Sequence, residues 1–169
     1  MEHFIKIPNN VNIYCKNQKV YFEGTYGIES LYFSPFRIKI FSDKLIISNI
    51  NSKNLNFCQT FITLIQQLIR GVISGYKNQL QLVGVGFRCK VVDNKLELKL
   101  GFSHLIYTNI PNNIKLECFK NKIVIKGTSK QKINEFANFL QSLKFPEPYK
   151  GKGIFLKNQK ILKKQGKKV

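Results

Sequence analysis

The chain has 169 residues, of which 43% are hydrophobic, and its 28 lysines and arginines against nine acidic residues give a net charge of +19. This length fits one domain or two small ones, and no run of 18 apolar residues is present, which excludes a transmembrane helix and membrane insertion. So large a positive charge indicates an anionic partner, with nucleic acid first and an anionic membrane surface second.

Cysteine and histidine spacing argues against a metal site or cofactor. The four cysteines include no Cys-x-x-Cys pair, and His3 and His104 are far from all of them in sequence. We therefore expect no metal ligands and interpret the thiols as buried groups in a reducing compartment. The cysteines are Cys15, Cys58, Cys89 and Cys118.

An internal repeat indicates a duplicated structural unit. Ile7–Thr25 aligns with Ile110–Thr128 without a gap, and eight of the 19 columns are identical, including Cys15 with Cys118. Most other columns keep their apolar character. Each copy has the period-two alternation of two short strands joined by a turn, so we expect two similar domains.

The rest of the first half predicts a second hairpin and a helix. Ser30–Asn49 has strand-like alternation, with a turn near Ser42-Asp43. An amphipathic helix follows and ends between Gly71 and Gly75. Its apolar positions are Phe57, Phe61, Leu64, Ile65, Leu68 and Ile69.

The second half repeats these parts in another order. Gln79–Val92 and Lys95–Gly101 predict a hairpin that turns at Asp93-Asn94, and the repeated hairpin comes next. Thr128 and Gln131 then form a capping-box pattern that opens a helix. That helix has Ile133, Phe136, Ala137, Leu140 and Leu143 at helical spacing, and Pro146 and Pro148 end it.

The predicted fold class is α+β, with two similar small domains from an internal duplication. Each domain is a mostly antiparallel sheet packed on one helix, the first over residues 1–76 and the second over residues 77–145. Residues 146–169 are expected to form an extended basic C-terminal arm, because they have little apolar periodicity. From Lys144 onward the chain holds nine lysines against one acidic residue, Glu147.

The arm begins with a segment suited to phosphate binding. In Phe145–Phe155, two prolines fix an extended entry, and Tyr149 offers a ring and a hydroxyl. Lys150 and Lys152 alternate with glycines, which let the backbone approach a phosphate while the lysines supply charge. A solvated flexible tail is the alternative interpretation of such a charged run.

Pro146–Ile154, PEPYKGKGI, resembles the C-terminal signature of the universal large-subunit ribosomal protein six family. Three further segments are similar to the family in the same order, and together they cover nearly the whole chain. They are LIRGVISGYKNQLQLVGVGFRCKV (Leu68–Val91), LGFSHLI (Leu100–Ile106) and GTSKQKINEFA (Gly127–Ala137).

The resemblance implies two duplicated α+β domains and no enzyme activity. It implies binding to large-subunit rRNA near the sarcin–ricin loop, beside neighbouring large-subunit proteins and the docking site of translational GTPases. The matching motifs imply RNA contacts at Ser103, His104, Tyr149, Lys150, Gly151, Lys152 and Gly153. Charge extends this candidate set to Lys157, Lys163, Lys164, Lys167 and Lys168.

The chain departs from the family pattern in its first segment and at single positions that include Leu105 and Ser129. The chain begins MEHFIK where the family has a short basic segment, so the resemblance does not carry an N-terminal RNA contact over to this chain. Leu105 replaces a common proline after Ser-His, and Ser129 replaces a common aspartate.

Two further function classes fit the residues less well. Gly84-x-Gly86 suggests a dinucleotide enzyme, but Cys89 stands where the third glycine belongs and the pattern is that of a strand. Ser103 beside His104 has no carboxylate motif to complete a triad. A non-ribosomal basic RNA-binding protein remains the alternative to the ribosomal function.

Composition also bears on the compartment. Lys, Asn, Ile, Phe and Tyr predominate, and all have AT-rich codons, which favours an organellar genome. We expect a location in the large ribosomal subunit of the mitochondrial matrix, with the bacterial cytoplasm or a plastid as the alternative.

Overall fold

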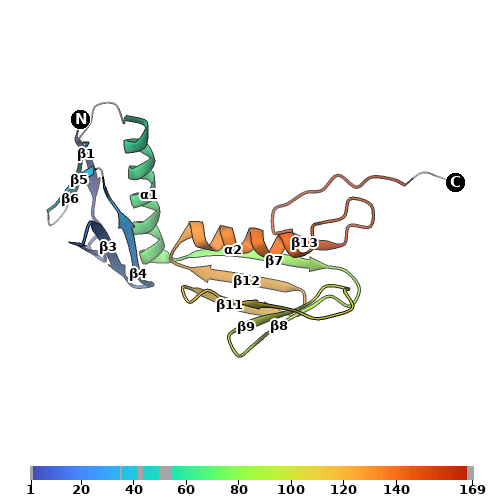
Figure 1. The fold of residues 1–169 in the computed structure, drawn as a ribbon. Helices are drawn as coiled ribbons and strands as arrows, with labels where there is room; N and C mark the ends of the chain where they lie inside the picture. The colour runs from blue at the N-terminus through green and yellow to red at the C-terminus, as the bar shows by residue number, and fades with distance from the viewer. Residues whose placement is uncertain (1, 35, 42–43, 50–54, 167–169) are drawn as a thin grey trace. The chain divides into compact units, whose positions relative to one another are not determined.

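The computed structural model describes residues 2–34, 36–41, 44–49 and 55–166 (Figure 1). The chain divides into two compact units. The first comprises residues 1–76 and 128–130, and the second comprises residues 77–127 and 131–169. Antiparallel strand pairs and helices occur in both, so the predicted α+β fold class is confirmed.

The first unit contains two three-stranded antiparallel sheets, β1–β6–β5 and β2–β3–β4. The helix α1 (Leu55–Ser74) packs its apolar stripe on them, with Ile65 fully buried and the rings of Phe36 and Phe61 stacked at 4.6 Å. Gly75, at φ +67°, ends α1 as predicted. The strands are β1 Glu2–Lys6, β2 Asn12–Lys16, β3 Lys19–Gly24, β4 Gly27–Tyr32, β5 Phe36–Ile40 and β6 Lys44–Asn49.

The second unit contains a four-stranded sheet, β11–β12–β7–β13, and a three-stranded sheet, β10–β9–β8. The helix α2 (Lys130–Leu143) lies along β7 and β12 (Figure 1). Ile123, Val124 and Ile125 of β12 are all buried, so both faces of that strand are covered. The strands are β7 Tyr76–Val83, β8 Arg88–Val92, β9 Lys95–Lys99, β10 Ile106–Asn109, β11 Ile114–Phe119, β12 Lys122–Gly127 and β13 Gly153–Leu156.

Both copies of the repeat fold alike. The first copy forms the hairpin β2–β3 and the second forms β11–β12. A turn precedes each hairpin, closed by a hydrogen bond from the N–H of Val11 to the Pro8 carbonyl and from the N–H of Ile114 to the Pro111 carbonyl. The paired positions Val20 and Ile123 are both fully buried. The residues that the two copies of the repeat have in common therefore specify the same turn and the same buried face of the hairpin.

Strand pairing differs from the prediction in two places. The sequence predicts one hairpin over residues 30–49, but β4 pairs with β3, and the second hairpin is β5–β6. The predicted turn residues 42–43 lie outside the described residues. The stretch from residue 79 to 92 is also two strands, because Gly86 at φ +76° breaks it between β7 and β8.

Two local predictions are wrong. The helix α2 begins at Lys130, which makes Ser129 the residue before its first turn and leaves Thr128 one position too early for the capping box. Cys15 is exposed, not buried, because β2 is an edge strand of its sheet. Cys58 is buried in the first core as expected, whereas Cys89 and Cys118 are only partly buried.

Candidate nucleic-acid interface

Ser103 and His104 lie on the loop between β9 and β10, in the second unit. Both are exposed, and Gly101 at φ +75° starts the turn that presents them. Phe102 stacks on the His104 ring, with 6.2 Å between ring centroids. The loop thus presents an aromatic side chain and polar hydrogen-bonding groups to solvent.

Lys144 joins this loop to the C-terminal segment. Its ammonium Nζ lies 4.4 Å from the centre of the Phe102 ring, in cation–π geometry. The carbonyl of Lys144 also accepts a hydrogen bond from the N–H of Ile154, at 3.0 Å. Two sequence-predicted parts of the site, about 40 positions apart in the chain, therefore meet at the C-terminal end of α2.

The segment from Glu147 to Lys152, which we call the Gly-Lys loop, is closed by hydrogen bonds and is not an extended arm. The N–H of Glu147 donates to the Lys152 carbonyl at 2.8 Å, and the N–H of Gly151 donates to the Glu147 carbonyl at 3.0 Å. Gly151 adopts φ +65°, which favours glycine. Tyr149, Lys150 and Lys152 are exposed on this loop.

Beyond the loop, β13 holds the chain on the second unit. It pairs antiparallel with β7, and the sequence analysis missed it. Ile154 is fully buried, and the buried side chain of Gln141 donates to its carbonyl at 3.3 Å. The N–H of Lys157 donates to the Gln79 carbonyl at 3.0 Å. These hydrogen bonds fix the base of the basic segment.

The chain then returns to the Gly-Lys loop. The N–H of Lys164 donates to the Pro148 carbonyl at 3.0 Å, and a Cβ on Gly151 would lie 3.7 Å from Cε of Lys163. Lys163 and Lys164 are exposed there. Four exposed lysines therefore belong to one small region, Lys150 and Lys152 within the loop and Lys163 and Lys164 beside it.

These four lysines form no salt bridge within the described part of the chain. Because their ammonium groups are not held in ion pairs, they favour phosphate oxygens as ligands, although Glu147 lies in the same loop. Exposed aromatic rings at Tyr149 and His104 add groups that stack on bases or donate to backbone oxygens.

The remaining predicted site residues fall elsewhere. Gly153 is buried at the start of β13 and is therefore not exposed to a ligand. Lys157 is exposed but follows β13 at its far end. Lys167 and Lys168 lie outside the described residues. The sequence analysis did not select Phe102 and Lys144, because a cation–π pair between distant segments leaves no local signal.

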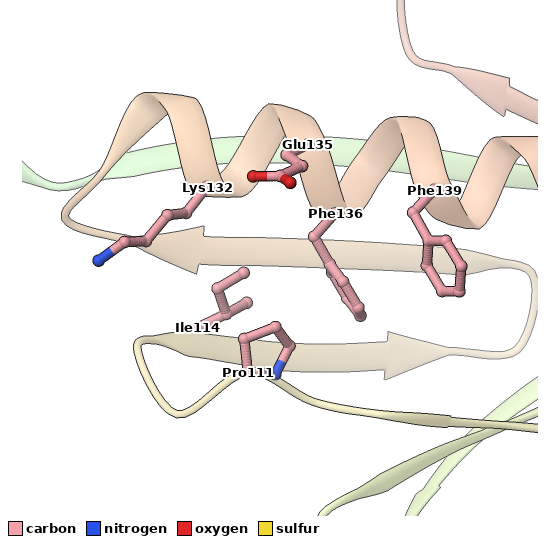
Figure 2. Close-up of a pocket in the computed structure, with 6 residues that line it drawn as sticks. All are labelled: Pro111, Ile114, Lys132, Glu135, Phe136 and Phe139. Atoms are coloured by element: carbon pink, nitrogen blue, oxygen red, sulfur yellow. The ribbon is translucent and has the colours of Figure 1, made fainter.

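An apolar pocket lies between α2 and the strand β11, with a volume of about 340 Å³. Figure 2 shows the rings of Phe136 and Phe139 pointing from the helix toward Pro111 and Ile114. Lys132 and Glu135 complete its lining. The lining is mostly apolar, which does not provide the converging polar groups that a catalytic centre needs.

The described ranges contain neither a metal-ligand cluster nor a membrane-spanning helix. No cluster of three or more His, Cys, Asp or Glu side chains there has the arrangement of metal ligands. No helix in those ranges is long and apolar enough to cross a membrane. Gly84 and Gly86 lie on a loop between two strands, which contradicts a dinucleotide-binding turn.

Comparison with known proteins identifies the family. A family model described as ribosomal protein L6 matches residues 83–155. The chain is 41% identical over 176 residues to the large ribosomal subunit protein uL6m of Reclinomonas americana, covering 97% of this chain and 95% of that protein. The chain belongs to the ribosomal protein L6 family. The resemblance drawn from its motifs is confirmed.

Bacterial members of the L6 family are similar over the same length. The chain is 36% identical over 170 residues to uL6 of Mycoplasma capricolum, covering 96% of this chain and 93% of that protein. It is 31% identical over 167 residues to uL6 of Shewanella piezotolerans, covering 97% and 95%. Because these L6 relatives are ribosomal proteins, the prediction that the chain is not an enzyme is confirmed.

The L6 family model spans both parts of the candidate interface. Its matched residues 83–155 include the loop with Ser103 and His104 and the whole Gly-Lys loop. The basic residues from Lys157 onward lie outside the matched range.

Proposed function

We propose that this protein is a structural constituent of the large ribosomal subunit and binds rRNA through its second unit. The observation that carries the proposal is the cluster of Lys150, Lys152, Lys163 and Lys164 around one hydrogen-bonded loop. L6 family membership supplies the ribosomal context.

The loop is suited to the RNA backbone. Lysine ammonium groups bind phosphates as point charges, and the turn at Gly151 permits close approach of the protein backbone. Only three of the 28 basic residues are arginines, so few guanidinium groups are available to read base edges. Recognition therefore depends on RNA shape, phosphates and 2′-hydroxyl groups.

The finer parts of the proposal follow the family resemblance. We place the bound rRNA near the sarcin–ricin loop, so that translational GTPases dock nearby and other large-subunit proteins are neighbours. The C-terminal segment, hydrogen-bonded to β7 and joined to the Phe102 ring through Lys144, would serve as a brace, because it cannot move without breaking those contacts. Similarity to uL6m of Reclinomonas americana and the AT-rich codon bias support the mitochondrial matrix as the compartment.

Sedimentation of native lysate through a sucrose gradient tests the ribosomal assignment. We expect the protein to travel with the large subunit at low salt and to remain with it when EDTA separates the subunits. Chemical crosslinking at Lys150 should then recover large-subunit rRNA. Migration at the top of the low-salt gradient as a free 19.6 kDa species would favour a non-ribosomal RNA-binding protein instead.

A further inference from the structure

Cys89 and Cys118 lie side by side in the second unit, although the sequence gives them no pairing motif. Cys89 is on β8 and Cys118 is on β11, so the two residues belong to different sheets. The Cys89 sulfur lies 3.7 Å from the carbonyl oxygens of Lys120 and Lys122, at the turn between β11 and β12. Strand β8 packs against β11, and Cys118 is only two residues before Lys120, so the Cys89 sulfur lies beside the end of β11 that carries Cys118. The two thiols are close enough to shift each other's pKa.

The two neighbouring thiols are chemically unequal. A hydrogen bond from the Cys118 thiol to the Cys89 thiolate would lower the pKa of Cys89, although partial burial opposes that effect. The same hydrogen bond raises the pKa of Cys118, and burial raises it further. Because the thiolate is the nucleophile, Cys89 is the group that reacts first.

Both residues are also partly exposed to solvent. Cys58, in contrast, is buried in the core of the first unit. Cys15 is exposed, but none of the other three cysteines is in its sheet. A small oxidant therefore meets one thiol pair that is both accessible and preassembled.

We propose that Cys89 and Cys118 form a redox modification site, in which a hydroperoxide converts the dithiol into a disulfide. The Cys89 thiolate attacks the terminal peroxide oxygen and becomes a sulfenic acid, while the peroxide O–O bond breaks and its other oxygen leaves as water or an alcohol. The Cys118 sulfur then attacks the Cys89 sulfur and expels the sulfenic oxygen as a second molecule, water. Two thiols lose two electrons in total, and the peroxide is reduced by two.

The disulfide would join the two sheets of the second unit covalently. The β10–β9–β8 sheet carries the loop with Ser103 and His104, and the β11–β12–β7–β13 sheet anchors the Gly-Lys loop through β13. Oxidation would therefore hold the two parts of the candidate interface in a fixed relation, and reduction would release this link. The proposal does not depend on the ribosomal function, because it concerns only the protein's own thiols.

Peptide mapping of the oxidised full-length protein tests the site. Purified protein treated with a slight excess of hydrogen peroxide should lose about 2 Da for the pair of hydrogens released by one disulfide. A non-reducing digest should contain Cys89 linked to Cys118, and dithiothreitol should restore two alkylatable thiols. The wild-type chain suffices for this measurement, so no variant needs to fold.

Two variants sharpen the test. Cys15→Ser should form the same linked peptide, because Cys15 takes no part in the reaction. Cys118→Ser removes the resolving thiol, so Cys89 should accumulate as a sulfenic acid that dimedone traps. Oxidation of Cys15 alone, or disulfides only between separate chains, would overturn the proposal.

Discussion

Gly151, on the Gly-Lys loop, and Gly153, directly after it at the start of β13, have different roles. Gly151 adopts φ +65° on the turn, and a Cβ there would meet only the flexible end of Lys163, at 3.7 Å. Gly153 is buried at φ +143°, and a Cβ there would lie 2.7 Å from the Phe145 carbonyl oxygen and from Cα of Pro146. Gly153 thus permits close packing of two backbone segments, which seats the loop on the sheet.

Substitution Gly153→Ala should therefore destabilise the second unit. The added methyl group collides with backbone atoms that cannot rotate away, in a backbone conformation that alanine rarely adopts. We expect the free energy of unfolding to fall by about 1–3 kcal/mol. Urea unfolding followed by circular dichroism measures the change.

Gly166→Ala is the matched control, because nothing lies within 4 Å of a Cβ at that position. It should leave the unfolding midpoint unchanged. Equal effects of the two substitutions would contradict the packing role assigned to Gly153.

Regular elements with strong periodicity could be predicted from sequence, and the short strand β13 could not. The two helices and the hairpins β2–β3, β8–β9 and β11–β12 follow from apolar spacing and turn residues. The four residues of β13 are too few to show a period. Their strand conformation depends on hydrogen bonds to β7, about 70 positions earlier in the chain.

The candidate interface shows the same division. Tyr149, Lys150 and Lys152 could be selected from composition and motif, because charge and glycine spacing are local properties. What anchors their loop to the sheet is not local, since the Gln79 carbonyl on β7 accepts the hydrogen bond from Lys157 and the Gln141 side chain on α2 donates to the Ile154 carbonyl. The sequence therefore indicated which side chains belong to the candidate interface, but it predicted an extended backbone for them instead of a closed loop.

Gln141 offers a test of this anchoring. Its side-chain amide donates to the Ile154 carbonyl and to the side-chain oxygen of Gln159. Substitution Gln141→Leu leaves both acceptors without this donor, at a cost of about 1–3 kcal/mol. Because this cost favours transient opening of the segment, trypsin should cleave after Lys157 or Lys160 roughly tenfold faster. Mass spectrometry of a timed digest measures the rates.

Ser142→Ala provides the control from the neighbouring position. Ser142 is exposed and its hydroxyl donates only within α2, to the Phe139 carbonyl at 2.7 Å. Its removal should not change cleavage in the C-terminal segment. If Gln141→Leu also left the cleavage rate unchanged, the amide hydrogen bonds would not be what holds β13 in place.

The duplication gives the molecule two similar hairpins, but the basic segment occurs once. The first unit contains a packed core around α1, and its copy of the repeat is followed by the strand β4. In the second unit the repeat is followed by α2, β13 and the nine-lysine segment. The proposed phosphate-binding surface thus belongs to one of the two duplicated units. The net charge of +19 is distributed more widely, so general attraction and the local site must be measured separately.

The salt dependence of RNA binding separates the general attraction of the protein's net charge from phosphate binding at the local site. Each phosphate that the protein no longer binds should decrease the magnitude of the slope of log affinity against log salt concentration by about 0.7–0.9. Lys150→Gln with Lys152→Gln removes two proposed phosphate ligands, so the slope should change by roughly 1.4–1.8. Filter binding of a large-subunit rRNA transcript over a range of salt concentrations measures it.

The matched variant is Lys16→Gln with Lys19→Gln, which removes the same charge from exposed positions around the β2–β3 turn. It should lower affinity slightly through the reduced net charge and leave the slope nearly unchanged. An equal decrease of the slope in both double variants would mean that RNA responds to the diffuse charge of the whole protein. A decrease confined to the Lys150 and Lys152 variant would instead locate the bound phosphates at the Gly-Lys loop.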